Sequence, residues 1–105
     1  MYKDKTISVV VPCYNEETQI SLVIETMPEY VDRIIIIDDC SDDNTVQIIE
    51  SFVQNDDRIV FIKHDINKGV GGSIETGYIW ARDHGMDVAV VMAGDAQMDP
   101  DDLPK

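Results

Sequence analysis

Four short runs of β-branched and other apolar residues, separated by segments with helical periodicity, constrain the fold of this chain most. The runs extend over Ile7 to Val11, Ile34 to Ile37, Ile59 to Ile62 and Val88 to Met92. Each is almost continuously apolar instead of alternating with polar residues, which is typical of strands covered on both faces. Such strands form parallel sheets joined by right-handed helical crossovers. We therefore predict an α/β fold with a parallel sheet and the order βαβαβαβ.

The three segments between these runs each carry a stripe of apolar residues at helical spacing. The first stripe follows NEET and stops near Pro28, the second follows the N-cap candidates of SDDNT, and the third begins in GGSIETG and ends near His84 and Gly85. The stripes are Ile20, Val23, Ile24 and Met27, then Val46, Ile49 and Phe52 or Val53, then Ile74, Tyr78 and Ala81. We expect these side chains to face the sheet.

Acidic residues dominate the charge of the chain. There are 21 Asp and Glu residues against 8 Lys and Arg, for a net charge of −13. This balance argues against nucleic acid and anionic lipid as direct partners. The 44% hydrophobic content excludes a wholly disordered chain, and 105 residues correspond to one domain or part of one, taken here as 1–105. An anionic ligand would need positive charge between itself and the protein.

Cysteine usage and the apolar stretches bear on the compartment. Cys13 and Cys40 lack the spacing of CxxC or zinc motifs, so we predict free thiols in a reducing cytoplasm. The opening MYKDKTISVV passes from charged residues into a strand-like run, unlike a signal peptide. The stretches RIIIID and VAVVMAG are shorter than the ~20 residues of a membrane helix. Any membrane association is therefore expected to come from sequence outside this segment.

The chemically distinctive residues follow the predicted strands. They lie in the turns PCYNEE, DDCSDDN, HDINKGVGG and AGDAQMDP. In a parallel sheet every strand-to-helix turn emerges at the carboxyl edge, where open α/β sheets bind ligands. We therefore expect these four turns to converge on one site.

Clustered aspartates at this edge repel one another unless they are solvated, paired or bridged by a cation. We interpret Asp42 and Asp43 as helix-capping and solvent-exposed residues. Asp38 and Asp95 differ because each ends an apolar strand, which favours a functional role. Asp95 and the amide of Gln97 are hard oxygen ligands that suit Mg²⁺ or Mn²⁺. Such a cation would reconcile the acidic edge with an anionic ligand.

The sequence NKGVGGS places Asn67, Lys68 and Gly69 before a helix. Glycine allows close backbone approach, and a helix N-terminus favours negative charge. The spacing is that of neither a P-loop nor GxGxxG, so a plain glycine-rich turn stays an alternative.

The aromatic residues and histidines have simpler interpretations. His64 and His84 do not share metal-ligand spacing, so surface or helix-end roles are favoured. Trp80 and Tyr78 are expected to pack the third helix. Tyr14, in the first turn, serves either helix entry or nucleotide contact.

Taken together, VVVPCYNEE, IIIIDDCSDDNT, NKGVGGSIETG and VVMAGDAQMDPDDLP resemble the amino-terminal part of the family 2 glycosyltransferases of GT-A fold, which is Rossmann-like. The likeness is to dolichyl-phosphate mannosyltransferase-like and polyprenyl-phosphate sugar transferases and covers essentially the whole chain. It implies an inverting enzyme, cytoplasmic or at the cytoplasmic face of a membrane, with a nucleotide-diphosphate sugar as donor. The implied acceptor is a polyprenyl or dolichyl phosphate or a growing saccharide.

The resemblance also implies roles for individual residues. By this resemblance, the residues along the nucleotide are Pro12, Tyr14, Asn15 and Glu16. Asp38 would hydrogen-bond the base, with Asp39 alongside, and the nucleotide and diphosphate would be flanked by Asn67, Lys68 and Gly69. Asp95 and Gln97 would bind the metal. Ala93 stands where the family's DxD element has its first aspartate. A general base is expected beyond Lys105, so this chain supplies the donor-binding half and is not expected to be active alone.

Two other classes stay open. One is a non-catalytic nucleotide-binding or assembly module. The other is a phosphoacceptor receiver domain, which also gathers aspartates and magnesium at a parallel sheet edge. Receiver domains carry their acidic pair after the first strand, whereas here the double aspartate follows the second.

Overall fold

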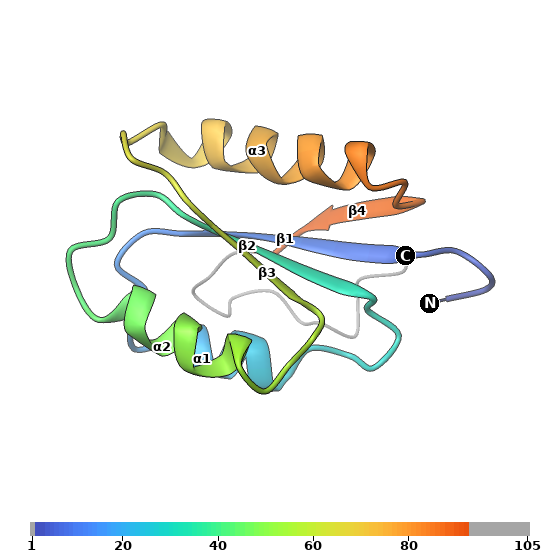
Figure 1. The fold of residues 1–105 in the computed structure, drawn as a ribbon, viewed down its shortest axis with the longest axis horizontal. Helices are drawn as coiled ribbons and strands as arrows, with labels where there is room; N and C mark the ends of the chain where they lie inside the picture. The colour runs from blue at the N-terminus through green and yellow to red at the C-terminus, as the bar shows by residue number, and fades with distance from the viewer. Residues whose placement is uncertain (1, 93–105) are drawn as a thin grey trace.

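A computed structural model describes residues 2–92 and shows a parallel sheet between two layers of helix (Figure 1). Within this range the elements are β1 (Ile7–Cys13), α1 (Ile20–Glu25), β2 (Arg33–Asp38), α2 (Thr45–Val53), β3 (Ile59–Lys63), α3 (Gly69–Asp83) and β4 (Val88–Val91). The predicted order of strands and helices is confirmed. Ala93, Asp95 and Gln97 lie outside the described residues.

The sheet has the strand order β3-β2-β1-β4, and all its pairings are parallel. The chain moves outward from β1 to β2 to β3, and α3 then carries it back past β1 to β4. Because such crossovers are right-handed, the outward and return connections lie on opposite faces. Accordingly α1 and α2 cover one face and α3 covers the other (Figure 1).

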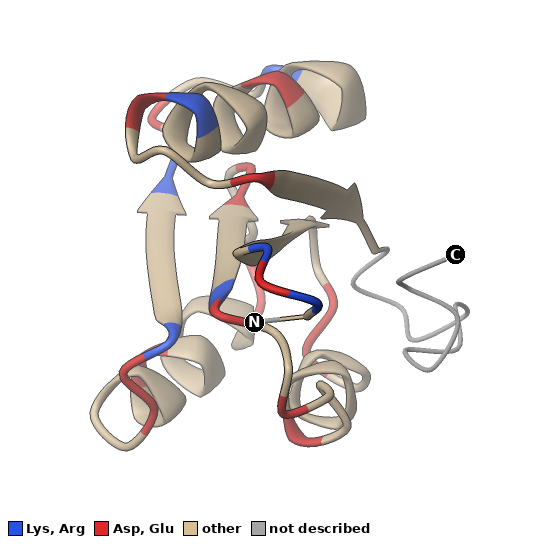
Figure 2. Ribbon diagram, turned by 90° about the vertical axis from the view of Figure 1, so that its right-hand side faces the viewer, with Lys and Arg blue, Asp and Glu red and all other residues tan. Residues whose placement is uncertain are grey.

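The two central strands explain the continuous apolar runs. In β2, Ile34 and Ile36 join the core beneath α1 and α2, while Ile35 and Ile37 join the core beneath α3. All four side chains are fully buried. Charged residues lie instead on helices, loops and strand ends, as the largely tan strands of Figure 2 show.

Helix α3 contacts the sheet through a stripe that shares Ala81 with the predicted one but otherwise differs from it. Its buried residues are Ser73, Gly77 and Ala81, and Tyr78 is 44% exposed. A Cβ at Gly77 would lie 2.4 Å from Cγ1 of Val10. The prediction that Tyr78 packs α3 onto the sheet is therefore wrong, because small residues let the helix backbone approach the strands closely.

The neighbouring aromatic residue behaves as expected. Trp80 is half-buried against the core beneath α3, and its ring stacks on that of His84 with centroids 3.9 Å apart. His84 caps the C-terminus of α3, which confirms its predicted helix-end role. Gly85 follows with φ 71°, a conformation that glycine adopts without strain.

The cysteines and the helices can be compared with the predictions of free thiols and of no membrane-spanning segment. Both cysteines are free thiols, with Cys13 buried and Cys40 half-buried. None of the helices in residues 2–92 combines the length and the apolar character needed to cross a membrane.

Candidate functional site

The turns that follow β1, β2 and β3 lie together at the carboxyl edge of the sheet, on the left of Figure 1. Backbone hydrogen bonds join them in sequence. The N–H of Asp39 donates to the carbonyl of Cys13 at 2.9 Å, and the N–H of His64 donates to the carbonyl of Asp38 at 2.9 Å. The parallel sheet therefore brings three of the four predicted turns to one edge.

The first and second turns are also linked through side chains. The N–H of Asn15 donates to Oγ of Ser41 at 2.9 Å, and Oδ1 of Asn15 accepts the N–H of Asp42 at 2.9 Å. The N–H of Glu16 donates to Oγ1 of Thr45 at 2.8 Å. Asn15 has φ 53°, in the left-handed region that asparagine tolerates better than most residues. These contacts order the turn in which Tyr14 lies 51% exposed.

The two aspartates before α2 are predicted to be helix-capping and solvent-exposed residues. Oδ1 of Asp43 accepts the N–H of Thr45, the first residue of α2, at 2.9 Å. Asp42 is exposed. The N-cap of α2 is Asn44, so Asp43 accepts the first N–H of the helix from one residue before the cap. The solvent interpretation of Asp42 is confirmed.

Asp38 is the most unusual group at this edge. The residue is only 3% exposed, and Oδ2 accepts the N–H of Ser41 at 3.2 Å. Oδ1 is buried and has no hydrogen-bond partner within residues 2–92. Leaving a buried acceptor unpaired costs about 1–3 kcal/mol, so this oxygen is available to a donor that the described residues do not provide.

Asp39, by contrast, uses both carboxylate oxygens within the chain. Oδ1 accepts the N–H of Lys68 at 2.8 Å and faces Nδ1 of His64 at 2.9 Å, while Oδ2 accepts the N–H of Gly69 at 2.8 Å. Burial acts to raise the pKa of Asp39, but the hydrogen bonds from Lys68, His64 and Gly69 outweigh it and hold that pKa below its ordinary value. The carboxylate also lies at the N-terminus of α3, where negative charge is favourable.

The turn before α3 is held by the same contacts. Oδ1 of Asn67 accepts the N–H of Gly69 at 3.1 Å, and Gly69 has φ 75°. Lys68 is exposed. Gly69 is the first residue of α3, two residues earlier than the start predicted from GGSIETG. Its left-handed backbone turns the chain into the helix and aims its N–H at Asp39.

The sequence predicts a surface or helix-end role for His64, but the structure places its side chain in the interior. Its side chain is 5% exposed and lies between Asp39 and Thr76, with Nε2 2.9 Å from Oγ1 of Thr76. The surface interpretation fails because Lys63 pairs with Asp38 in the parallel register of β2 and β3, which places His64 beside Asp39. The sequence signal for His64 is its position directly after a strand, which is the same signal that points to Asp38.

Cys13 is buried close to acidic residues, and both conditions affect the pKa of its thiol. Burial raises the pKa of the Cys13 thiol, and the charges of Asp38 and Glu16 raise it further. Cys13 therefore remains a neutral thiol. Pro12, the preceding residue, is half-buried within β1 and pairs with Ile37.

The predicted metal ligands do not lie in the part of the chain that the structure describes. Within residues 2–92 no three His, Cys, Asp or Glu side chains cluster in a way that could hold a metal ion. Asp95 and Gln97, the predicted ligands, lie outside that range.

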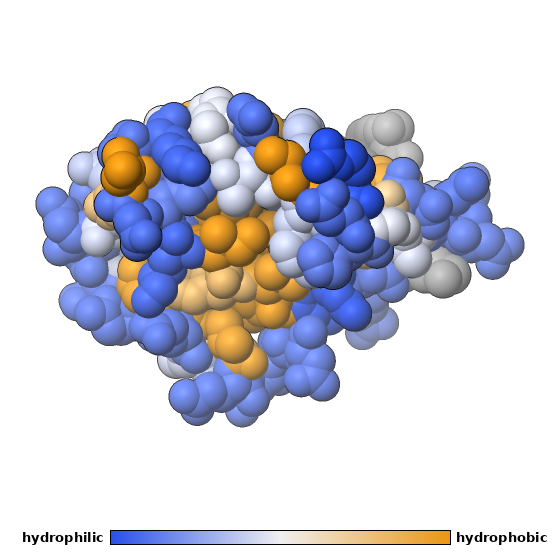
Figure 3. All heavy atoms as spheres, turned by 45° about the horizontal axis from the view of Figure 1, so that its top comes forward, coloured by the Kyte–Doolittle hydropathy of each residue, from blue (hydrophilic) through white to orange (hydrophobic). Residues whose placement is uncertain are grey.

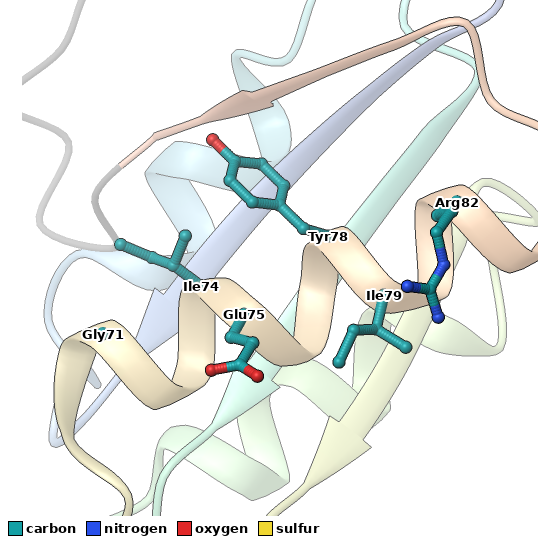
Figure 4. A pocket seen from close by; sticks show the side chains of 6 residues that line it. All are labelled: Gly71, Ile74, Glu75, Tyr78, Ile79 and Arg82. Carbon is teal, nitrogen blue, oxygen red and sulfur yellow. The ribbon is translucent and has the colours of Figure 1, made fainter.

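A hollow along α3 is distinct from this edge. Figure 4 shows Ile74 and Tyr78 leaving the helix on the side of β4, and Glu75 and Ile79 leaving it on the other side. The residues that line the hollow are Gly71, Ile74, Glu75, Tyr78, Ile79 and Arg82. An apolar area bordered by hydrophilic residues is visible on this side of the molecule in Figure 3. None of the predicted site residues lines the hollow.

Comparison with known proteins gives a consistent result. The model of the family described as glycosyl transferase family 2 matches residues 8–105. A UDP-N-acetylglucosamine–dolichyl-phosphate N-acetylglucosaminyltransferase of Methanococcus voltae is 38% identical over 97% of this chain and 46% of its own length. An undecaprenyl-phosphate mannosyltransferase of Micrococcus luteus is 26% identical over 91% of this chain and 40% of its own length. The chain thus spans less than half the length of these relatives.

Solved structures share the fold. A mannosyltransferase from Pyrobaculum calidifontis, in complex with GDP-Man and Mn²⁺, superposes with a TM-score of 0.76 over 90% of this chain and 28% of that one, at 17% identity. TarS 1–349 of S. aureus, in complex with UDP, gives a TM-score of 0.67 over 86% of this chain and 27% of that one, at 23% identity. These likenesses confirm the predicted GT-A fold.

Proposed function

Because the chain belongs to glycosyl transferase family 2, we propose that it forms the donor-binding part of an inverting glycosyltransferase. Its donor is a nucleotide-diphosphate sugar, and the acceptor of the whole protein is a polyprenyl or dolichyl phosphate or a growing saccharide at the cytoplasmic face of a membrane. The names of the two relatives, both transferases to lipid phosphates, support this choice.

Oδ1 of Asp38, which has no hydrogen-bond partner within residues 2–92, carries the proposal. A buried carboxylate oxygen accepts hydrogen bonds and donates none, so it selects a base that offers an N–H at its edge. Uracil offers N3–H and guanine offers N1–H in the ring. Cytosine has an acceptor at that ring position and donates only from its exocyclic amine, so it would have to shift in the site to reach Asp38. A hydrogen bond to a charged group is worth about 1.5–3 kcal/mol, or roughly a tenfold to hundredfold difference in affinity. We therefore expect UDP or GDP to be bound in preference to CDP.

A divalent cation completes the proposed site. Asp95 and Gln97 would hold Mg²⁺ or Mn²⁺, which would offset the repulsion between the diphosphate and the acidic edge. The Mn²⁺ bound together with GDP-Man in the Pyrobaculum calidifontis mannosyltransferase supports this assignment. Pro12, Tyr14, Asn15 and Glu16 would lie along the nucleotide, as the resemblance to the family implies.

Calorimetric titration of the 105-residue chain with UDP, GDP and CDP, each with and without Mn²⁺, tests the proposal. We expect Mn²⁺-dependent binding of UDP or GDP, and at least tenfold weaker binding in Asp38→Asn, which loses the charge that accepts the base. Asp42→Asn is the matched control, because it removes one charge from an exposed residue of the same turn. Asp95→Ala should abolish the Mn²⁺ dependence. Folded protein that binds no nucleotide, or Asp38→Asn that binds like Asp42→Asn, would contradict the proposal.

A further inference from the structure

His64 joins three segments of the chain at the candidate site. Nδ1 of His64 lies 2.9 Å from Oδ1 of Asp39, at the end of β2, and Nε2 lies 2.9 Å from Oγ1 of Thr76, in α3. His64 itself follows β3 directly. The side chains of His64 and Asp39 are each 5% exposed, so water competes little for these contacts.

The protons of this network can be assigned from its partners. An ionised carboxylate accepts hydrogen bonds only, so Nδ1 of His64 carries a proton and donates a hydrogen bond to Oδ1 of Asp39. The hydroxyl of Thr76 has one proton and lies within reach of both Nε2 and the carbonyl of Gly72, the latter at 3.0 Å. Thr76 either donates to Nε2 or donates to Gly72 while accepting from a protonated Nε2. The bond from His64 to Asp39 is the same in both arrangements.

That bond bears on the turn before α3. Asp39 accepts three donors, of which two are the backbone N–H groups of Lys68 and Gly69. The third donor, from His64, shares Oδ1 with Lys68 and fixes the direction of the carboxylate. Loss of the His64 bond would leave the carboxylate held only by the Lys68 and Gly69 N–H groups, so the turn that they belong to would have to hold Asp39 without support from β3.

We propose that His64 is a positioning residue for nucleotide binding, because its ring fixes Asp39 and Asp39 in turn fixes the turn formed by Asn67, Lys68 and Gly69. This inference rests on the proposed function for its ligand, a nucleoside diphosphate. It assigns His64 no contact with that ligand.

Two conservative substitutions separate the contacts of the ring. In His64→Asn the amide nitrogen takes about the place of Nδ1 and keeps a donor for Asp39. In His64→Gln the longer side chain takes the place of Nε2 and keeps only the contact with Thr76. We expect His64→Asn to bind UDP within about threefold of the wild type and His64→Gln to bind it at least about tenfold more weakly. A residue needed only for stability would lower the melting temperature without separating the two variants in this way.

A spectroscopic measurement without nucleotide makes the test independent of the proposed function. In ¹⁵N-labelled protein the amides of Lys68 and Gly69 should be protected from hydrogen exchange in the wild type and in His64→Asn. In His64→Gln they should shift and exchange faster, while amides within β1 stay unchanged. Thr76→Val removes the partner of Nε2 and should leave the Lys68 and Gly69 signals close to those of the wild type. If His64→Gln does not fold, Thr76→Val and His64→Asn are the two variants in which these signals are measured.

The outcomes are distinguishable. Absence of nucleotide binding in the wild type would contradict the proposed function, and the amide signals would still decide whether His64 holds the turn. Unchanged amide signals in folded His64→Gln would overturn the inference. A tenfold loss of UDP affinity in folded His64→Asn would overturn it as well.

Discussion

Replacing Gly77 by alanine tests how α3 is seated on the sheet. A Cβ at this position would lie 2.4 Å and 2.9 Å from the two methyl carbons of Val10 and 3.1 Å from Cδ1 of Ile37. Carbon atoms in contact prefer separations of about 3.5–4.0 Å, so either α3 or Val10 must move by roughly 1 Å. Neither Val10 nor Ile37 has exposed surface into which it could relax.

The magnitude follows from two opposing effects. Overpacking a buried site costs about 1–3 kcal/mol. Alanine is better than glycine in a helix by about 0.8–1.0 kcal/mol, which offsets part of that cost. The difference is about 0–2 kcal/mol, and the 2.4 Å approach to Val10 favours its upper half. We therefore expect Gly77→Ala to lower the free energy of unfolding by about 1–2 kcal/mol, which corresponds to roughly 4–16 °C in melting temperature for a domain of this size.

Gly71→Ala is the matched control within the same helix. A Cβ at Gly71 would have nothing within 4 Å, so the same chemical change should stabilise the protein by up to about 1 kcal/mol. Urea unfolding followed by circular dichroism measures both variants. Stabilisation by Gly77→Ala similar to that by Gly71→Ala would refute the close seat of α3.

A double-mutant cycle identifies the contact. Val10→Ala removes the two methyl groups nearest to the added Cβ, so Gly77→Ala should be less costly, or even favourable, in that background. We expect a coupling free energy of about 1 kcal/mol or more between the two sites. Additive effects would mean that the steric conflict lies elsewhere.

Two further predictions concern the turn before α3. The pKa of Asp39 is held below its ordinary value of 3.8, so its hydrogen bonds stabilise the folded state above about pH 4 and lose that effect as the pH falls through the folded pKa. Asp39→Asn should therefore be less stable than the wild type at neutral pH, with the two unfolding free energies converging in acid, and parallel curves would contradict this role. Gly69→Ala keeps the N–H that Asp39 accepts but places a side chain at φ 75°, which should cost about 1–2 kcal/mol in urea unfolding. A stabilisation like that expected of Gly71→Ala would show that this conformation is not required.

The sequence was sufficient for the order of the elements and for the edge at which the turns meet. The runs around Val9 and Ile35 are continuous because both faces of the sheet are covered, and that burial is what the apolar pattern records. Convergence of the turns then follows from parallel strands alone. The face of α3 could not be predicted in the same way, because Ser73, Gly77 and Ala81 seat the helix by their small size and a search for large apolar residues finds Tyr78 instead.

Strand geometry explains why the two neighbouring aspartates have different environments. Successive side chains of a strand point to opposite faces, and in β2 the even positions Ile34 and Ile36 face α1 and α2 while the odd positions face α3. Continuing this alternation places Asp38 on the side of α1 and α2 and Asp39 on the side of α3. The contacts agree, since Asp39 accepts the N–H groups at the start of α3 and the N–H of Ser41, before α2, reaches Asp38.

The same alternation determines what each carboxylate can do. Asp39 meets the N-terminus of α3, where backbone N–H groups are available, and both of its oxygens are used there. Within residues 2–92, Oδ2 of Asp38 accepts the N–H of Ser41, and Oδ1 has no partner. The sequence DD therefore encodes one residue that orders the turn before α3 and one whose Oδ1 has no partner within residues 2–92, which is the oxygen that we propose accepts the nucleotide base. Exchanging the two roles would require a one-residue shift of β2, which would also turn its buried isoleucines to the opposite faces.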